Sequence, residues 1–150
     1  MSDTFSPDDV KFMQLALELA AKGQYTTAPN PSVGCVLVKN GEIVGKGFHF
    51  KAGEPHAERV ALADAGEKAK GATAYVTLEP CPMCAGAIIN SRIEKVYFGA
   101  YDKKSGCAGS VINLFESGMF NHNVNVTGGI TEDKCASILT EFFRDLRKKK

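Results

Sequence analysis

Residues 73–90 read TAYVTLEPCPMCAGAIIN and combine a strand, a turn and the start of a helix. Thr73–Leu78 is rich in β-branched and aromatic residues, which favour a strand. A proline at the first helical position then predicts a short helix over Pro82–Asn90. Cys81 and Cys84 stand three residues apart at the first turn of this helix, where both thiolates can bind one metal ion. The positive end of the helix dipole also favours their ionised form.

Similar strand, turn and helix signals recur along the rest of the chain. Ser6-Pro7-Asp8-Asp9 has an N-cap serine, a first-turn proline and two acids, and the helix that it starts ends at Gly23. Asn40-Gly41 is typical of a type I′ hairpin turn. The other predicted elements are strands Val33–Val38, Ile43–Phe48, Lys95–Ala100 and Val124–Thr127, helices His56–Ala65 and Thr131–Arg147, and a helical turn Val111–Phe115. This order predicts an α/β/α layered domain with a mixed five-stranded sheet.

Length and composition predict one ordinary globular domain over residues 1–150. The N-terminus lacks the apolar region of a secretion signal, and no apolar run approaches the roughly 20 residues of a membrane span, so we expect a cytoplasmic protein. Five cysteines, an odd number, argue against a disulfide framework. The net charge of +1 excludes a global polycation, and the basic segment Arg144–Lys150 is most simply a solvated helix end.

A second motif supplies the rest of a zinc site. His56-Ala57-Glu58 opens a predicted helix 25 residues before Cys81. His56, Cys81 and Cys84 would give zinc three protein ligands and leave a fourth position for water, as in catalytic sites. Glu58 lies close enough to take a proton from that water and return it to a leaving amine. H-x-E paired with P-C-x-x-C is the signature of zinc nucleobase deaminases.

The same residues allow two other interpretations. A structural zinc would need a fourth cysteine or histidine at matched spacing, and Cys107 and Cys135 lie in unsuitable contexts. Like Cys35, they are expected to be core thiols. A catalytically silent, zinc-stabilised binding module is the rival from another class, and an intact Glu58 speaks against it.

On these residues the chain resembles two families of the zinc-dependent cytidine/deoxycytidylate deaminase superfamily. Residues 29–80, from Pro-Asn-Pro-Ser-Val-Gly-Cys-Val through Gly-Glu-Pro-His-Ala-Glu to Leu-Glu-Pro, resemble the pyrimidine deaminase domain of riboflavin biosynthesis. Residues 81–150, with Cys-Pro-Met-Cys-Ala-Gly-Ala-Ile-Ile-Asn, Tyr-Phe-Gly-Ala-Tyr-Asp and Gly-Cys-Ala-Gly-Ser, are similar to the bacterial tRNA-specific adenosine deaminases. Both resemblances imply a cytidine-deaminase-like fold, a bound zinc ion and a homodimer.

The two halves disagree about the substrate. The short cysteine spacing and the end of the chain at residue 150 are adenosine-deaminase features, whereas Ser32 and His49 replace the proline and asparagine typical of that family. Either a natural homologue with mixed features or an engineered hybrid would explain this, and a junction within a block that both families share favours the hybrid. We expect adenosine-to-inosine conversion in a tRNA anticodon loop or single-stranded nucleic acid. The alternatives are the riboflavin-pathway diaminopyrimidine and, less favoured, another free base.

The resemblance also implies substrate contacts. Those of the second half are Asp102, Ser105, Ser110, Asn121, His122 and Phe143, with Lys103, Lys104, Arg144 and Arg147 facing phosphate. Ala57 would lend its backbone N–H. Asn30 would contact substrate, although turn chemistry alone could explain it. His49 and His122 fit either a pocket wall or a purely structural role, and Glu79 fits either a supporting role at the zinc site or a helix cap.

Overall fold

The computed structural model describes residues 5–23, 27, 31–116, 120 and 122–148, and of residues 142, 143 and 145–148 it describes the backbone only. Its centre is a five-stranded sheet in the order β2-β1-β3-β4-β5. The strands are β1 (Gly34–Lys39), β2 (Glu42–Phe48), β3 (Thr73–Leu78), β4 (Lys95–Ala100) and β5 (Asn125–Gly128). β1 pairs antiparallel with β2 and β3, whereas β3, β4 and β5 run parallel. The predicted mixed sheet is confirmed.

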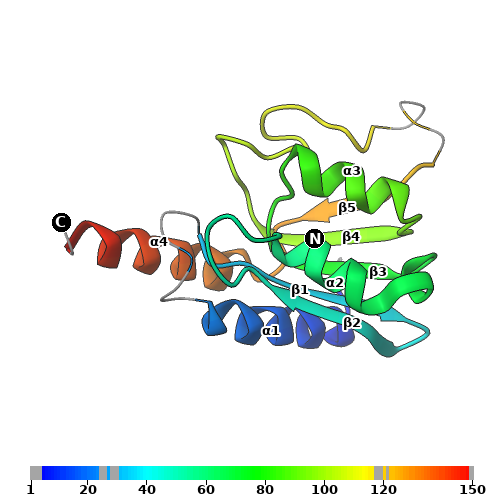
Figure 1. Cartoon of the computed structure of the whole chain (residues 1–150), viewed down its shortest axis with the longest axis horizontal. Helices are drawn as coiled ribbons and strands as arrows, with labels where there is room; N and C mark the ends of the chain where they lie inside the picture. The colour runs from blue at the N-terminus through cyan, green and yellow to red at the C-terminus, as the bar shows by residue number, and fades with distance from the viewer. Residues whose placement is uncertain (1–4, 24–26, 28–30, 117–119, 121, 149–150) are drawn as a thin grey trace.

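Helices cover both faces of this sheet (Figure 1). α1 (Pro7–Lys22) and α4 (Glu132–Lys148) lie on one face, and α2 (Ala57–Ala65) and α3 (Pro82–Asn90) lie on the other. A short 3₁₀ turn, Gly66–Ala69, follows α2. Each face has its own buried cluster of apolar side chains, one beneath α2 and α3 and one beneath α1. The predicted α/β/α layers are therefore confirmed.

Local sequence signals determine the turn between β1 and β2 and the start of α1. Asn40 and Gly41 take φ angles of 54° and 79° between β1 and β2, as a type I′ turn requires. Ser6 and Asp9 form a capping box at the start of α1. Tyr75 on β3 donates a 2.6 Å hydrogen bond to the Asp9 carboxylate, which ties this helix start to the centre of the sheet.

The predicted helical turn Val111–Phe115 is wrong. The chain forms an irregular loop there, with a single antiparallel bridge between Ala108 and Asn113. Its backbone amides bond outside a helical pattern: that of Val111 donates to the Gly106 carbonyl, and that of Ser110 to a buried side chain described below. Irregular hydrogen bonds within the loop, and one from Ser110 to a distant side chain, thus replace those that a helical turn would make.

Within the described part of the chain, no helix combines the length and the apolar character needed to cross a membrane.

Candidate active site

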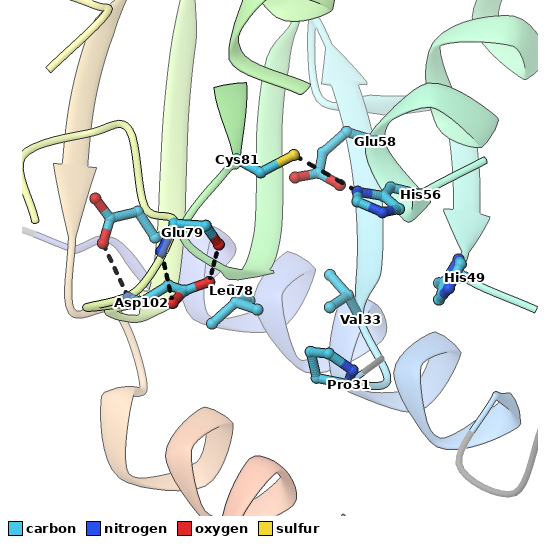
Figure 2. Close-up of a pocket in the computed structure, with 10 residues that line it drawn as sticks. Pro31, Val33, His49, His56, Glu58, Leu78, Glu79, Cys81 and Asp102 are labelled. Atoms are coloured by element: carbon cyan, nitrogen blue, oxygen red, sulfur yellow. Dashed lines mark hydrogen bonds between the residues drawn. The ribbon is translucent and has the colours of Figure 1, made fainter. Parts of the chain in front are cut away.

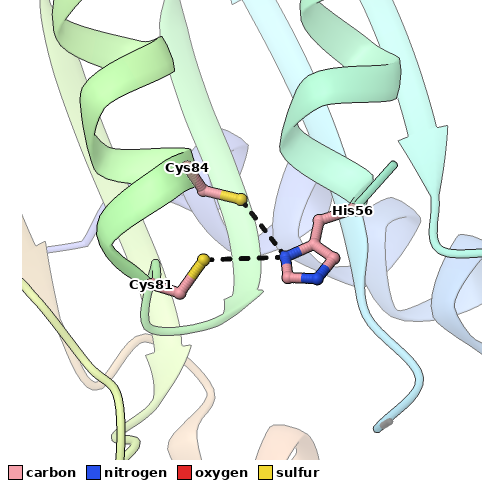
Figure 3. A group of neighbouring side chains, drawn as sticks. All are labelled: His56, Cys81 and Cys84. Atoms are coloured by element: carbon pink, nitrogen blue, oxygen red, sulfur yellow. Dashed lines mark hydrogen bonds between the residues drawn. The ribbon is translucent and has the colours of Figure 1, made fainter. Parts of the chain in front are cut away.

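The three predicted zinc ligands come together where α2 and α3 begin (Figure 3). The Nδ1 atom of His56 lies 3.6 Å from the Cys81 sulfur and 3.5 Å from the Cys84 sulfur. All three donor atoms lie within 4.8 Å of one another. A tetrahedral zinc with Zn–S bonds of about 2.3 Å and Zn–N bonds of about 2.0 Å has S–N edges of about 3.5 Å. The donor set and its spacing therefore fit zinc without rearrangement.

Backbone packing places this group. α2 lies close against β2 because Gly47 carries no side chain there: a Cβ atom at Gly47 would lie 2.6 Å from the Ala57 carbonyl oxygen. On the other side, Pro82 begins α3 and Cys81 is its N-cap residue. α2 and α3 contact one another on the same face of the sheet, and both present their N-terminal ends to the site.

The thiol pair already stabilises one negative charge. A hydrogen bond from Cys84, opposed by burial and reinforced by His56, lowers the pKa of Cys81 to about 5. The same hydrogen bond, together with burial, raises the pKa of Cys84 well above its ordinary value, because its proton is held against Cys81. A cation bound between the two sulfurs would replace that proton.

Glu58 is buried in the first turn of α2, with 4% of its surface exposed. Its carboxylate points toward Cys81 and His56 (Figure 2). Burial, which disfavours the charged form, raises its pKa to about 7, with a further rise from Cys81. A zinc ion in the neighbouring ligand group would lower this pKa, so that the carboxylate is ionised and can accept a proton from water at neutral pH.

These groups open into a pocket with about 590 Å³ of empty space, partly open to solvent. It lies beyond the carboxyl ends of the parallel strands β3 and β4, where α/β folds commonly bind ligands. The residues that line it are Pro31, Val33, His49, His56, Glu58, Leu78, Glu79, Cys81, Asp102 and Ser105 (Figure 2).

Three of the predicted substrate contacts lie in this wall. His49 is buried beside His56, with 5.2 Å between ring centroids, and its Nδ1 lies 3.1 Å from the Pro55 carbonyl oxygen. Asp102 and Ser105 lie on the opposite side, in the loop after β4, where the Ser105 hydroxyl donates to the Asp102 carboxylate. A fourth, Ala57, is buried between the histidine and the glutamate, and the role of its N–H stays a prediction.

Other predicted contacts lie elsewhere. The Ser110 hydroxyl donates to the Glu79 carboxylate and does not line the pocket. The Nε2 atom of His122 lies 2.7 Å from the carbonyl oxygen of Ile93, which precedes β4. The pocket lies beyond the other end of β4. A six-residue strand separates the two by about 20 Å. Asn30, Asn121 and the side chain of Phe143 lie outside the described residues.

Sequence reasoning missed Pro31, Val33 and Leu78 as wall residues and left the role of Glu79 open. The first three are apolar side chains beside functional positions, and no local pattern distinguishes them from core residues. Glu79 caps no helix: its carboxylate accepts backbone hydrogen bonds from the loop after β4. An acid directly before the Pro-Cys motif was the available signal.

A carboxylate next to a three-ligand zinc position is the arrangement by which zinc hydrolases activate water. The fold and this site place the chain in that class of enzyme. Residues 6–100 match the family model of the cytidine and deoxycytidylate deaminase zinc-binding region. The chain belongs to this family and is a zinc-dependent nucleobase or nucleoside deaminase.

Relatives with two different activities are similar to it. The riboflavin biosynthesis protein RibD of Haemophilus influenzae is 54% identical over 150 residues, which are 96% of this chain and 39% of that protein. The tRNA-specific adenosine deaminase of Bacillus subtilis is 43% identical over 151 residues, 95% of this chain and 92% of that protein. The chain thus spans about two fifths of the length of the RibD relatives that it matches.

Solved structures divide in the same way. Acinetobacter baumannii RibD has a TM-score of 0.79 and 43% identity, covering 90% of this chain and 38% of that one. A tRNA:A34 deaminase studied for adenosine-to-inosine editing at the wobble position has a TM-score of 0.74 and 34% identity, covering 86% of this chain and 99% of that one. Both families therefore share this fold over most of the chain.

Proposed function

We propose that this enzyme deaminates adenosine to inosine in a tRNA anticodon loop or another single-stranded nucleic acid. Deaminase chemistry rests on one observation, the convergence of His56, Cys81 and Cys84 beside the buried Glu58. The choice of a polymeric substrate rests on the distribution of charge around the pocket.

The described residues that line the pocket include no lysine or arginine. A base extruded from a nucleic acid would enter such a pocket alone and leave its phosphates outside. Lys103 and Lys104 are exposed between the wall residues Asp102 and Ser105, where they can meet those phosphates. A small phosphorylated substrate would find no cation in the described lining.

The residues of the chain divide the chemistry among them. Zinc, when bound, supplies a Lewis acid that activates water at neutral pH. His56, Cys81 and Cys84 hold it, and their position at two helix starts keeps the ligand group rigid. Glu58 accepts a proton from water on the substrate side and delivers it to the departing amine, so that ammonia leaves and a carbonyl remains.

Deamination of a riboflavin-pathway pyrimidine is the second candidate. The 54% identity to RibD of Haemophilus influenzae supports it. So does a Buchnera aphidicola relative named diaminohydroxyphosphoribosylamino-pyrimidine deaminase, which is 42% identical and of which the match covers 97%. That name describes a phosphorylated substrate, so a pocket lined without a cation is the observation against it.

One comparison of substrates tests both candidates. The zinc-loaded enzyme is given an anticodon stem-loop RNA with a single adenosine, a DNA oligomer with a single deoxyadenosine, and the diaminopyrimidine. Ammonia release and product mass are measured, with Glu58→Gln as the blank. Inosine in RNA or DNA supports the proposal. Turnover of the pyrimidine alone overturns it in favour of the second candidate, and no turnover of any of the three overturns both in favour of another free base or the silent binding module.

A homodimer stays a proposal as well. The exposed apolar side chains Met83, Val111 and Ile112 lie on α3 and in the loop after β4, and they support it. Light scattering coupled to size-exclusion chromatography would measure the mass in solution and compare it with the 16.1 kDa of one chain. The hybrid origin of the chain remains a prediction that the fold does not test.

A further inference from the structure

The pocket contains a second buried carboxylate, Glu79, which is only 2% exposed. Its Oε1 atom accepts hydrogen bonds from the Asp102 backbone N–H at 3.0 Å and from the Ser110 hydroxyl. Its Oε2 atom accepts from the backbone N–H groups of Ala108 at 2.9 Å and Ser110 at 3.0 Å. One side chain thus binds both ends of the segment 102–110, which is the first part of the loop that follows β4.

These four hydrogen bonds use the acceptor capacity of the carboxylate, which has about four lone-pair sites. Glu79 therefore has no free site for a substrate proton or a metal ion, even though it lines the same pocket as Glu58. Hydrogen bonds from backbone N–H groups to a charged oxygen are also stronger than those between neutral groups. The geometry fits a structural anchor for the loop.

Gly106 shows how tightly the loop lies on this anchor. A Cβ atom at position 106 would stand 2.4 Å from the carboxyl carbon of Glu79 and 2.5 Å from the Asp102 carbonyl oxygen. Neither of these atoms can move without breaking the hydrogen bonds just described. The glycine is therefore needed for contact with the carboxylate.

The anchored segment carries the pocket wall. The Asp102 carboxylate accepts hydrogen bonds from the backbone of Lys104 and Ser105, and its carbonyl oxygen accepts one from Gly106. Asp102 and Ser105 line the pocket, and Figure 2 shows Asp102 on the side opposite His49. Their positions depend on the hydrogen bond by which the Glu79 carboxylate holds the Asp102 backbone N–H.

We propose that Glu79 is a positioning residue for the substrate: it fixes residues 102–110 so that Asp102 and Ser105 stand at the right distance from the reacting centre. It contacts neither the ligand group nor the reacting atoms in this assignment. The inference rests on the proposed function for its substrate, because the wall matters only if a base enters the pocket.

Glu79→Gln tests this assignment. Glutamine has the same size, but its NH₂ group would face N–H donors of the loop, so the loop must shift. We expect the KM for the stem-loop RNA to rise about tenfold and kcat to change by less than about threefold, since the wall moves while Glu58 and the zinc ligands do not. Zinc content by metal analysis should equal that of the wild type.

A matched control separates positioning from general loss of stability. Asp9→Asn also removes a charged acceptor of a short hydrogen bond, but on the opposite face of the sheet, in the first turn of α1. It should lower the melting temperature and leave KM unchanged. If Glu79→Gln only destabilised the fold, a smaller fraction of the protein would be active. The apparent kcat and the zinc content would then fall, and KM would not change. That result overturns the proposal, as does a variant with wild-type kinetics.

Ser110→Ala keeps the test decisive if Glu79→Gln does not fold, because it removes only one of the four hydrogen bonds. KM should rise in the same direction by about threefold, and an unchanged KM overturns the assignment. Binding of labelled stem-loop RNA to Glu58→Gln, with and without the second substitution, gives the same comparison without turnover. If the parent Glu58→Gln protein binds no RNA, the proposed function fails, whereas equal binding by both proteins refutes only the role of Glu79.

Discussion

Glu58→Gln gives the sharpest test of how the two buried carboxylates differ. Glu58 and Glu79 line one pocket and are 4% and 2% exposed. Glu79 is committed to four donors of the loop after β4. Glu58 instead adjoins the ligand group, where its charge is disfavoured by burial and its pKa is raised to about 7. The same chemical change at both positions should therefore have different kinetic consequences.

The expected loss follows from the proton transfer that Glu58 performs. General acid–base catalysis by one positioned side chain contributes about 10²–10⁴-fold, which corresponds to roughly 3–5 kcal/mol of activation free energy. Glutamine has the same shape but cannot carry the proton, so kcat should fall by that factor. The ligand group does not include Glu58, and zinc content should remain at one per chain.

The assay measures initial rates of ammonia release, zinc content and the near-ultraviolet circular dichroism of the folded protein. The chain has no tryptophan, so its four tyrosines report tertiary packing. Glu79→Gln is the matched control, because it is expected to raise KM and to leave kcat nearly unchanged. A Glu58→Gln enzyme that keeps its zinc and retains kcat within about threefold of the wild type would refute the assigned proton carrier.

Three further predictions concern stability, helix packing and phosphate contact. Asp9→Asn should cost about 1–2 kcal/mol of unfolding free energy at neutral pH, because it weakens the hydrogen bond from Tyr75. Burial raises the pKa of Asp9, but hydrogen bonds from Tyr75 and the helix start outweigh it and leave that pKa lowered. The wild type thus loses this stabilisation as the pH falls through the lowered pKa, below about 4, and the difference in urea midpoints should vanish in acid. Gly47→Ala should lower melting temperature and zinc content together, because its Cβ would meet the first turn of α2; full zinc occupancy would contradict this. Replacing Lys103 and Lys104 by alanine should weaken RNA binding and reduce the slope of log affinity against log salt by about 1.4, measured by filter binding; an unchanged slope would exclude phosphate contact.

The elements that carry the chemistry were predictable because their signals are local. A proline at the first turn of α3, a capping box on α1 and an Asn-Gly turn between β1 and β2 each act within a few residues. The zinc group was predictable for another reason. Thiolate, imidazole and carboxylate in two fixed spacings are seldom required by packing alone, so the motif indicates convergence even though its halves stand 25 residues apart.

The loop after β4 could not be predicted in the same way. Val111–Phe115 has the apolar pattern of a helical turn, but the Val111 and Leu114 amides donate to the carbonyls of Gly106 and Cys107, which a helical turn does not use. Ser110 was taken for a substrate contact, and the structure places its hydroxyl on Glu79 instead. His122 was assigned to the pocket by resemblance, yet β5 runs parallel to β4, so the chain returns to the opposite end of the sheet before that residue. No pattern of neighbouring residues encodes these long-range contacts.

The same division explains why the family of deaminases is shown while the substrate remains a proposal. The ligand group and Glu58 belong to α2 and α3, whose geometry follows from helix starts and from the close approach of α2 to β2 at Gly47. Deamination of any ring amine needs only these parts. Selection among bases needs the wall, which consists of His49 on one side and the loop anchored by Glu79 on the other. A change of substrate preference should therefore come from substitutions at positions 49 and 102–110, while the zinc group and its carboxylate stay unchanged.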